Sequence, residues 1–173
     1  MNKPVDANAP LVAHQELYIA APIAWVWALQ SDIAAWPRWQ PEITNVTLDG
    51  LPTAGVTFRW KAKGLPIVST LHTVDAPHQI GWTGNSPGMF AVHNWTLIAR
   101  GAGTRVMTAE SLSGWLAHLL KRFDPTFLEK SLDAALQRLK AQAEATWDKA
   151  NGTHAGESLP PTVDDPGRAA GHI

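Results

Sequence analysis

The longest helical periodicity in the chain lies near its end, in residues 114–149. In the second half of this stretch, Asp124 and Pro125 have the residue types of an N-cap and of a first helical position. Apolar residues then recur at steps of three and four: Phe127, Leu128, Leu132, Ala135, Leu136, Leu139, Ala143 and Trp147. Because an isolated helix of this kind is not stable in water, its apolar stripe must pack against another surface.

Strand-like segments precede the helix and can provide that surface. The clearest alternation runs through residues 55–63, where Val56, Phe58 and Trp60 are apolar and the positions between them are polar. A strand with one polar face is typical of an antiparallel sheet. Further strands are expected at residues 11–20, 43–48, 67–74, 79–83, 89–99 and 104–112.

Two short helical segments are expected after the first strand. The first occupies residues 22–30 and begins with a proline, and the second ends near Trp36-Pro37. Residues 36–41 are rich in aromatic residues and proline, which favours a rigid connection rather than a helix. The glycine, asparagine, serine and proline of residues 84–88 predict a loop.

This order of elements predicts an α+β fold with a single domain over residues 11–149. Consecutive strands joined by short turns form an antiparallel meander of about seven strands, whose inner face would curl over the terminal helix. Residues 1–10 show little pattern, and we expect a flexible arm there. Residues 150–173 are rich in glycine and proline and poor in large apolar side chains, which predicts a disordered tail.

The charge composition argues against polyanionic partners. The chain has 173 residues, of which 17% are charged, and its formal net charge is −1. No run of lysine and arginine is present that would attract nucleic acid or an anionic membrane, so we expect neither as a partner. No apolar run approaches the ~20 residues that a membrane-spanning helix needs, and no signal peptide is recognisable. These features favour a soluble protein of the cytoplasm.

Several motifs, taken in order, resemble the START-like (SRPBCC) helix-grip superfamily and most closely its polyketide cyclase/dehydrase-type branch. They are AAPIAWVW at residues 20–27, WPRW at 36–39, GW at 81–82, HNW at 93–95 and GTRV at 103–106, followed by Glu110 and Gly114. The resemblance covers residues 11–147 and implies a curved antiparallel sheet that grips a C-terminal helix around an apolar cavity. The superfamily includes ligand carriers, lipid-transfer modules, aromatase/cyclases and hormone receptors, so the resemblance constrains the fold more than the function.

His93 and Glu110 form the sharpest candidate site. If the last hairpin turns at residues 101–103 with Ala99 opposite Thr104, then Trp95 faces Thr108 and His93 faces Glu110 across the ladder. A buried pair of this kind can act as a proton shuttle, with the carboxylate orienting the imidazole as a general base. It can equally orient a ligand, or be a satisfied structural pair.

Aromatic side chains surround this pair in the expected sheet. The chain has nine tryptophans against one tyrosine and four phenylalanines. Residues expected to line a ligand pocket on or near the inner face are Phe58, Trp60, Trp82, Phe90, Trp95 and Thr108, with Phe123 and Phe127 of the terminal helix closing one end. The alternative is that these rings simply fill the core.

Other chemistries find less support in the sequence. The chain has no cysteine, which excludes disulfides and thiolate catalysis. No third residue joins His93 and Glu110 with metal-ligand spacing, no phosphate-binding loop is present, and no serine lies in a nucleophile-elbow context, so we expect no metal or cofactor. The face of His72 depends on the turn at Ala76-Pro77, and an outward position is favoured.

Three functions remain open at this point. The first is binding of a small hydrophobic molecule, such as a lipid, an aromatic compound or a polyketide-like compound, in a tryptophan-lined cavity. The second is a cyclase/dehydratase-type enzyme that uses His93 and Glu110 as acid and base. The third is a regulatory or stress-related module that binds a partner protein.

A second apolar stripe, at Trp115, Leu116, Leu119 and Leu120, is expected to pack within the molecule, although it could be a lid or the interface of a homodimer.

Overall fold

The computed structural model describes residues 3–154 of the chain. In this part, seven antiparallel strands form one sheet in the order β1-β7-β6-β5-β4-β3-β2. The elements in chain order are β1 (Leu11–Ile19), α1 (Ile23–Ser31), η1 (Ile33–Arg38), β2 (Ile43–Leu48), β3 (Thr57–Ala62), β4 (Leu65–Asp75), β5 (Gln79–Ser86), β6 (Met89–Arg100), β7 (Gly103–Ser113), α2 (Trp115–Phe123) and α3 (Phe127–His154). The α+β fold expected from the sequence is therefore confirmed.

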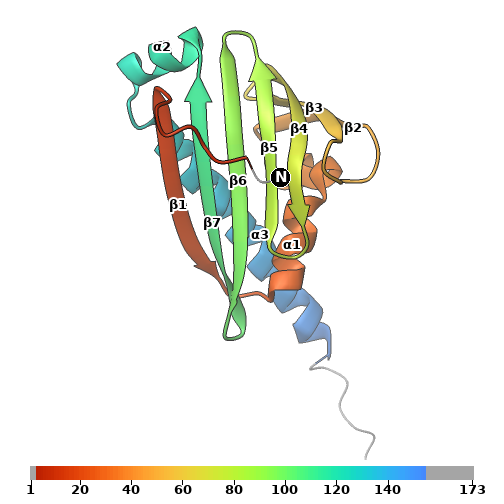
Figure 1. Ribbon diagram of the computed structural model, residues 1–173. Coiled ribbons are helices and arrows are strands. Elements are labelled where there is room, and N and C mark those ends of the chain that lie inside the picture. Colours follow the sequence, from red (N-terminus) through yellow and green to blue (C-terminus); the bar gives the residue numbers. More distant parts are fainter. Residues whose placement is uncertain (1–2, 155–173) are drawn as a thin grey trace, which may run out of the picture.

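Helix α3 packs against one face of the sheet, which we call the inner face (Figure 1). Its buried side chains fall at steps of three and four, as the sequence predicts: Leu128, Leu132, Leu136, Leu139 and Ala143. The helix packs mainly over β1, and it also contacts β7. An ion pair between Arg138 and Glu42 joins the middle of the helix to the segment before β2.

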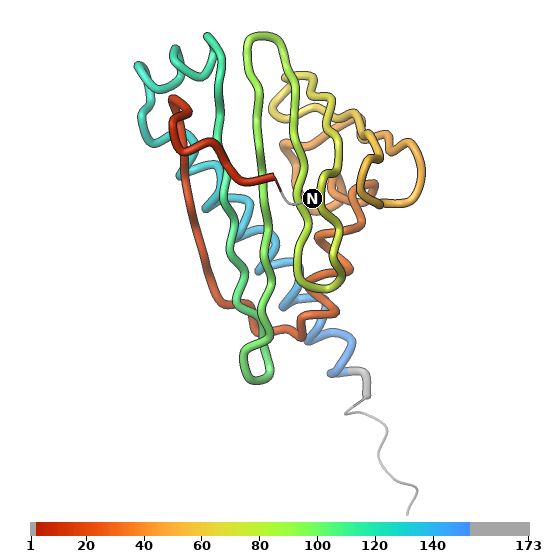
Figure 2. Tube along the Cα trace, viewed as in Figure 1, coloured from red at the N-terminus to blue at the C-terminus, as the bar shows by residue number. Residues whose placement is uncertain are grey.

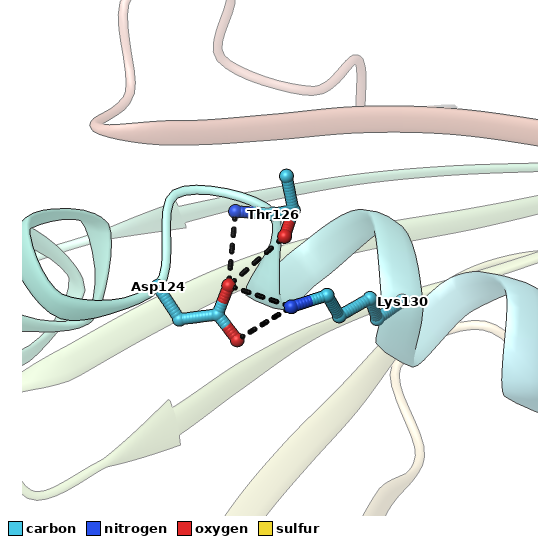
Figure 3. Close-up of polar contacts among 3 residues, drawn as sticks. All are labelled: Asp124, Thr126 and Lys130. Carbon is cyan, nitrogen blue, oxygen red and sulfur yellow. Dashed lines mark hydrogen bonds and ion pairs between the residues drawn. The ribbon is translucent and has the colours of Figure 1, made fainter.

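The expected helix at residues 114–149 is broken in two at Asp124 (Figure 3). Oδ1 of Asp124 accepts hydrogen bonds from the backbone N–H and the hydroxyl of Thr126, at 3.2 and 2.9 Å, and Lys130 Nζ donates to both carboxylate oxygens. These bonds, led by the one from Lys130, lower the pKa of Asp124. The cap is therefore real, but the helix begins at Phe127 rather than at Pro125, and it continues to His154, past the expected end at residue 149. The rest of the expected tail lies outside the described residues.

Two further segments differ from the sequence-based expectation. The expected connection at residues 36–41 begins within a 3₁₀-helix, since η1 includes Trp36, Pro37 and Arg38. The tighter 3₁₀ turn tolerates a proline that would break a longer α-helix. The expected loop at residues 84–88 is mostly strand, because β5 continues to Ser86 and only Pro87-Gly88 turns.

The N-terminal segment runs across the outer face of the sheet, opposite α3 (Figure 2). Lys3 N–H donates to Nδ1 of His72 at 3.3 Å, and the side-chain amide of Asn94 donates to Lys3 C=O at 2.9 Å. Asp6 N–H donates to the hydroxyl of Ser111 at 3.0 Å. From Lys3 onward, the expected flexible arm therefore has specific hydrogen-bond partners on β4, β6 and β7.

The core between α3 and the sheet consists of two apolar clusters. The larger cluster is centred on Trp36, Phe58, Trp82 and Trp95 and includes Leu136 and Leu139 of α3. The smaller cluster lies toward the start of α3 and contains Leu11, Ala13, Leu112, Ala117, Leu128 and Leu132. The inner-face positions of β6 and β7 between the two clusters are where the candidate site residues lie.

Candidate functional site

The register of the last hairpin places His93 directly opposite Glu110. Strands β6 and β7 pair without a shift, with Trp95 opposite Thr108 and Ala99 opposite Thr104. The turn at residues 101–102 contains Gly101 at φ 57°, a left-handed conformation that glycine adopts without strain. The expected pairing is therefore confirmed, and both side chains belong to the inner face, which bears Trp95, Leu97 and Leu112 as well.

His93, Thr108 and Glu110 form a buried polar cluster. His93 Nε2 lies 2.8 Å from Oγ1 of Thr108, and His93 Nδ1 lies 3.6 Å from a carboxylate oxygen of Glu110. The first distance is a hydrogen bond, whereas the second is too long for one. The imidazole also lies between two indoles, with ring centroids 4.7 Å from Trp82 and 5.5 Å from Trp95. His93 is thus fixed by one hydroxyl and two rings, and the Glu110 carboxyl retains hydrogen-bonding capacity.

Burial opposes charge on both members of the pair. Desolvation lowers the pKa of His93 to about 3 and raises the pKa of Glu110 to about 8. Burial therefore favours the uncharged imidazole and the protonated carboxyl near neutral pH, while 16% of the Glu110 side chain remains exposed. A neutral imidazole can accept a proton, and a protonated carboxyl can donate one or donate a hydrogen bond. Such strongly perturbed pairs are concentrated at functional sites.

Trp36 is the site-lining residue that sequence reasoning missed. It is 1% exposed and packs against three rings of β3 and β5, with centroid distances of 5.8 Å to Phe58, 5.9 Å to Trp60 and 5.3 Å to Trp82. The sequence predicts only a rigid connection at residues 36–41 and gives Trp36 no place in the site. The available signal was the spacing of Ile33 and Trp36, which lie three residues apart on one side of a 3₁₀-helix and are both buried.

The tryptophans differ in whether their indole N–H has a partner. Trp36 Nε1 donates to the backbone oxygen of Gln30 at 3.1 Å, and Trp60 Nε1 donates to Oγ of Ser69 at 3.0 Å. The Nε1 atoms of Trp39 and Trp95 are buried and find no hydrogen-bond partner among the described residues. Buried indole N–H groups normally have a partner, so both donors are unusual. Of the two, only Trp95 lies on β6, two residues after His93.

Two of the expected pocket residues, Phe90 and Phe123, lie elsewhere, whereas Phe127 packs at one end of the core. Phe90 is three residues before His93 on the same regular strand, so its side chain points to the opposite, outer face. There, Lys3 Nζ lies 5.0 Å from the centroid of the Phe90 ring. Phe123 lies on α2 and is 77% exposed, so it does not close one end of a pocket. Phe127 packs at the edge of the smaller cluster, with Lys63 Nζ 5.7 Å from its ring. The strict alternation of a strand excludes Phe90 from the site, and the break at Asp124 turns Phe123 outward.

His72 lies on the outer face, as the sequence analysis favoured. The pairing of β4 with β5 shifts between Leu71 and Thr73, so His72 occupies a bulge. Its Nδ1 lies 2.9 Å from the Thr73 hydroxyl and accepts from Lys3 N–H. A Cβ at Gly81 would lie 2.6 Å from the His72 ring, so the glycine makes room for it. His72 therefore does not join the polar cluster.

An open depression of about 420 Å³ lies at the end of the sheet where the β3–β4 and β5–β6 hairpins turn. Two of its lining residues, Trp60 and Ile67, belong to the inner face, and the others include Arg59, Lys61 and residues 85–87.

Within residues 3–154, no group of three histidine or acidic side chains is arranged to hold a metal ion. No helix in the same range is long and apolar enough to cross a membrane.

Comparison with known families identifies the fold family. The family described as "Polyketide cyclase / dehydrase and lipid transport" matches residues 11–144, most of the chain. The chain belongs to this family. No curated protein sequence matches the chain.

Solved structures share the fold at low sequence identity. A hypothetical protein of Helicobacter pylori superimposes with a TM-score of 0.71 at 17% identity, covering 80% of this chain and 91% of the other. A START superfamily protein of Mycobacterium smegmatis gives 0.62 at 16% identity, covering 78% and 98%. The di-domain ARO/CYC protein BexL from the BE-7585A biosynthetic pathway gives 0.61 at 20% identity, covering 79% of this chain and 52% of BexL. These matches confirm the expected helix-grip fold, a curved sheet around a long C-terminal helix.

The perturbed pKa of Glu110 predicts a specific dependence of stability on pH. Between pH 4.5 and about 8 the unfolded chain releases the Glu110 proton while the folded protein keeps it, so this group destabilises the fold progressively as pH rises through that window. Glu110→Gln removes the effect. In urea unfolding, the variant should gain stability relative to the native protein as pH rises from 4.5 to 8.

The control for this prediction is Glu129→Gln, which changes an exposed glutamate on α3. The lowered pKa of His93 has the opposite effect, because it reduces the stability of the fold as pH falls from 6.5 toward 3. His93 is present in both proteins, so its contribution to the stability cancels when the two are compared. A difference between Glu110→Gln and the native protein that stays constant across the window would contradict the assignment.

Proposed function

We propose that this protein binds a small, mainly apolar molecule between α3 and the inner face of the sheet, and that the molecule carries a hydrogen-bond acceptor. The observation that carries the proposal is the unpartnered, buried N–H of Trp95 beside the polar cluster of His93, Thr108 and Glu110. The family description, which includes lipid transport, and the helix-grip fold are consistent with a ligand-binding module.

The chemistry of the cluster defines what the ligand should present. Trp95 Nε1 is a donor only, and the protonated carboxyl of Glu110 can donate as well. Two neighbouring donors favour a ligand that carries a carbonyl or carboxylate oxygen. The remaining neighbours are rings and aliphatic side chains, which suit a flat or hydrocarbon body.

A cavity-filling substitution tests the binding proposal. Ala91 lies on the inner face between Gly84 and Leu112, two positions before His93. We expect Ala91→Phe to remove any apolar molecule that copurifies with the native protein, because the new ring takes its space. Native mass spectrometry followed by solvent extraction measures the loss.

Ala99→Phe is the matched control, since Ala99 is exposed on the same face of the same strand.

Trp95→Phe keeps an aromatic ring but removes the indole N–H. It should weaken binding roughly tenfold, the effect of one lost buried hydrogen bond. Retention of the same molecule at the same occupancy by both Ala91→Phe and Trp95→Phe, with unchanged melting temperatures, would contradict the proposal.

A second candidate function is a cyclase/dehydratase-type reaction, and one observation favours it. The imidazole of His93 and the carboxyl of Glu110 lie side by side at 3.6 Å, and burial favours the uncharged form of both. In a dehydration, His93 would take the proton from the carbon next to a carbonyl, and Glu110 would protonate the departing hydroxyl, so that water leaves and a carbon–carbon double bond forms. A β-hydroxy ketone with an aromatic substituent is the simplest probe of this reaction.

The enzyme candidate predicts that His93→Ala lowers the dehydration rate of that probe by roughly 10²- to 10⁴-fold, the usual contribution of a general base. Binding of the probe, followed by tryptophan fluorescence, should change little. The control is His14→Ala, on the outer face of β1. An equal rate in the native protein and in His93→Ala, or no turnover by the native protein, would contradict the enzyme candidate and leave ligand binding as the proposed function.

A further inference from the structure

Helix α2 presents an exposed apolar stripe that neither candidate function uses. Trp115, Leu119 and Phe123 follow one another at steps of four residues and are 67%, 44% and 77% exposed. Ala117 on the opposite side of the helix is fully buried in the smaller core cluster. The expected intramolecular packing of this stripe is therefore wrong for Trp115 and Leu119, and we call the three residues the α2 stripe.

The orientation of α2 is fixed by backbone contacts with the β5–β6 hairpin. Leu116 N–H donates to Gly88 C=O at 3.0 Å. Gly114 precedes the helix at φ 101°, and a Cβ there would lie 2.4 Å from the same oxygen. A Cβ at Gly88 would likewise lie 2.3 Å from the Trp115 ring. Both glycines allow this close approach, which fixes the orientation of α2 and keeps the α2 stripe directed toward solvent.

Two basic side chains are exposed in the last turn of the helix: Arg122 lies beside the stripe, seven residues after Trp115, and Lys121 lies on the side of Ala117, four residues after that alanine. No ion pair within residues 3–154 involves either basic side chain. No acidic residue occurs between Glu110 and Asp124, and Asp124 is occupied by Lys130. The exposed surface of α2 therefore combines large apolar side chains with uncompensated positive charge, although the whole chain has a net charge of −1.

We propose that α2 docks the protein onto an anionic lipid surface, with the α2 stripe in the interfacial region, Arg122 beside it on the lipid phosphates, and Lys121 adding positive charge at the end of the helix. Tryptophan and phenylalanine beside lysine and arginine are the composition of amphipathic helices that lie in the membrane interface. This inference does not depend on the proposed ligand site, because vesicle binding is measured without that ligand.

The size of the α2 stripe disfavours a second copy of the chain as its occupant. The three side chains expose on the order of 400 Å², taking roughly 150–250 Å² for each full aromatic side chain. A stable protein interface buries about 800 Å² on each partner. A second copy would also bring Lys121 and Arg122 near their own symmetry mates, whereas an anionic surface neutralises them.

Sedimentation with lipid vesicles tests the proposal on the full chain. The probes are vesicles of phosphatidylcholine alone and vesicles in which roughly a third of the lipid is phosphatidylserine. We expect binding to the anionic vesicles only. The pairs Trp115→Ala with Phe123→Ala and Lys121→Gln with Arg122→Gln should each weaken it at least tenfold, since each basic residue contributes roughly fivefold near such a surface.

Matched control pairs remove the same side-chain types elsewhere. Leu51→Ala with Ile98→Ala removes two exposed apolar side chains, and Lys61→Gln with Arg100→Gln removes two exposed positive charges. Both control pairs should bind within twofold of the native protein. Equal losses in the control pairs, or no sedimentation of the native protein with anionic vesicles, would overturn the proposal.

A direct readout is available because the chain has no cysteine. An environment-sensitive dye on Phe123→Cys should shift to the blue with anionic vesicles, whereas the same dye on Leu51→Cys should not. A shift of the Phe123 label that follows protein concentration without any lipid would assign the α2 stripe to a second copy of the chain and overturn the proposal.

Discussion

The structure depends on burial of the apolar stripe of α3 against the inner face of the sheet. Four leucines of this stripe are at most 2% exposed: Leu128, Leu132, Leu136 and Leu139. At about 2 kcal/mol for each fully buried side chain, their burial contributes at most roughly 8 kcal/mol, comparable to the whole stability of a typical domain. The same contact excludes water from the sheet positions beneath the helix, and it therefore sets the chemistry of every polar group there.

That exclusion explains the state of the polar cluster. His93 and Glu110 lie where the two apolar clusters meet, so both lose their hydration and both favour the neutral form. Thr108 satisfies one nitrogen of the imidazole, whereas the N–H of Trp95 has no protein partner. A fold that needed only stability would gain nothing from these groups, since apolar side chains of similar size would pack there at lower cost. Their presence is the physical reason to assign a function to this part of the inner face.

The sequence predicts the fold and the central pair well, because both follow from simple periodicities. The alternation of β6 and β7 and the glycine-containing turn between them suffice to place His93 opposite Glu110. The errors arise where tertiary contacts override local pattern. Trp36 is buried because a 3₁₀-helix carries it under the sheet, which the local Pro37 argued against. Phe123 is exposed because Asp124 ends α2, a break that apolar periodicity alone does not reveal.

The indole N–H resonance of Trp95 provides the most direct test of the account. Comparison of proton–nitrogen spectra of the native protein and Trp95→Phe assigns this signal among the nine indole signals. On addition of the molecule extracted from the protein, the account predicts that the Trp95 signal moves downfield as its N–H gains an acceptor, while the signal of exposed Trp115 stays in place. A bound molecule that leaves the Trp95 signal unchanged would contradict the central claim that this donor and its polar neighbours form the binding site.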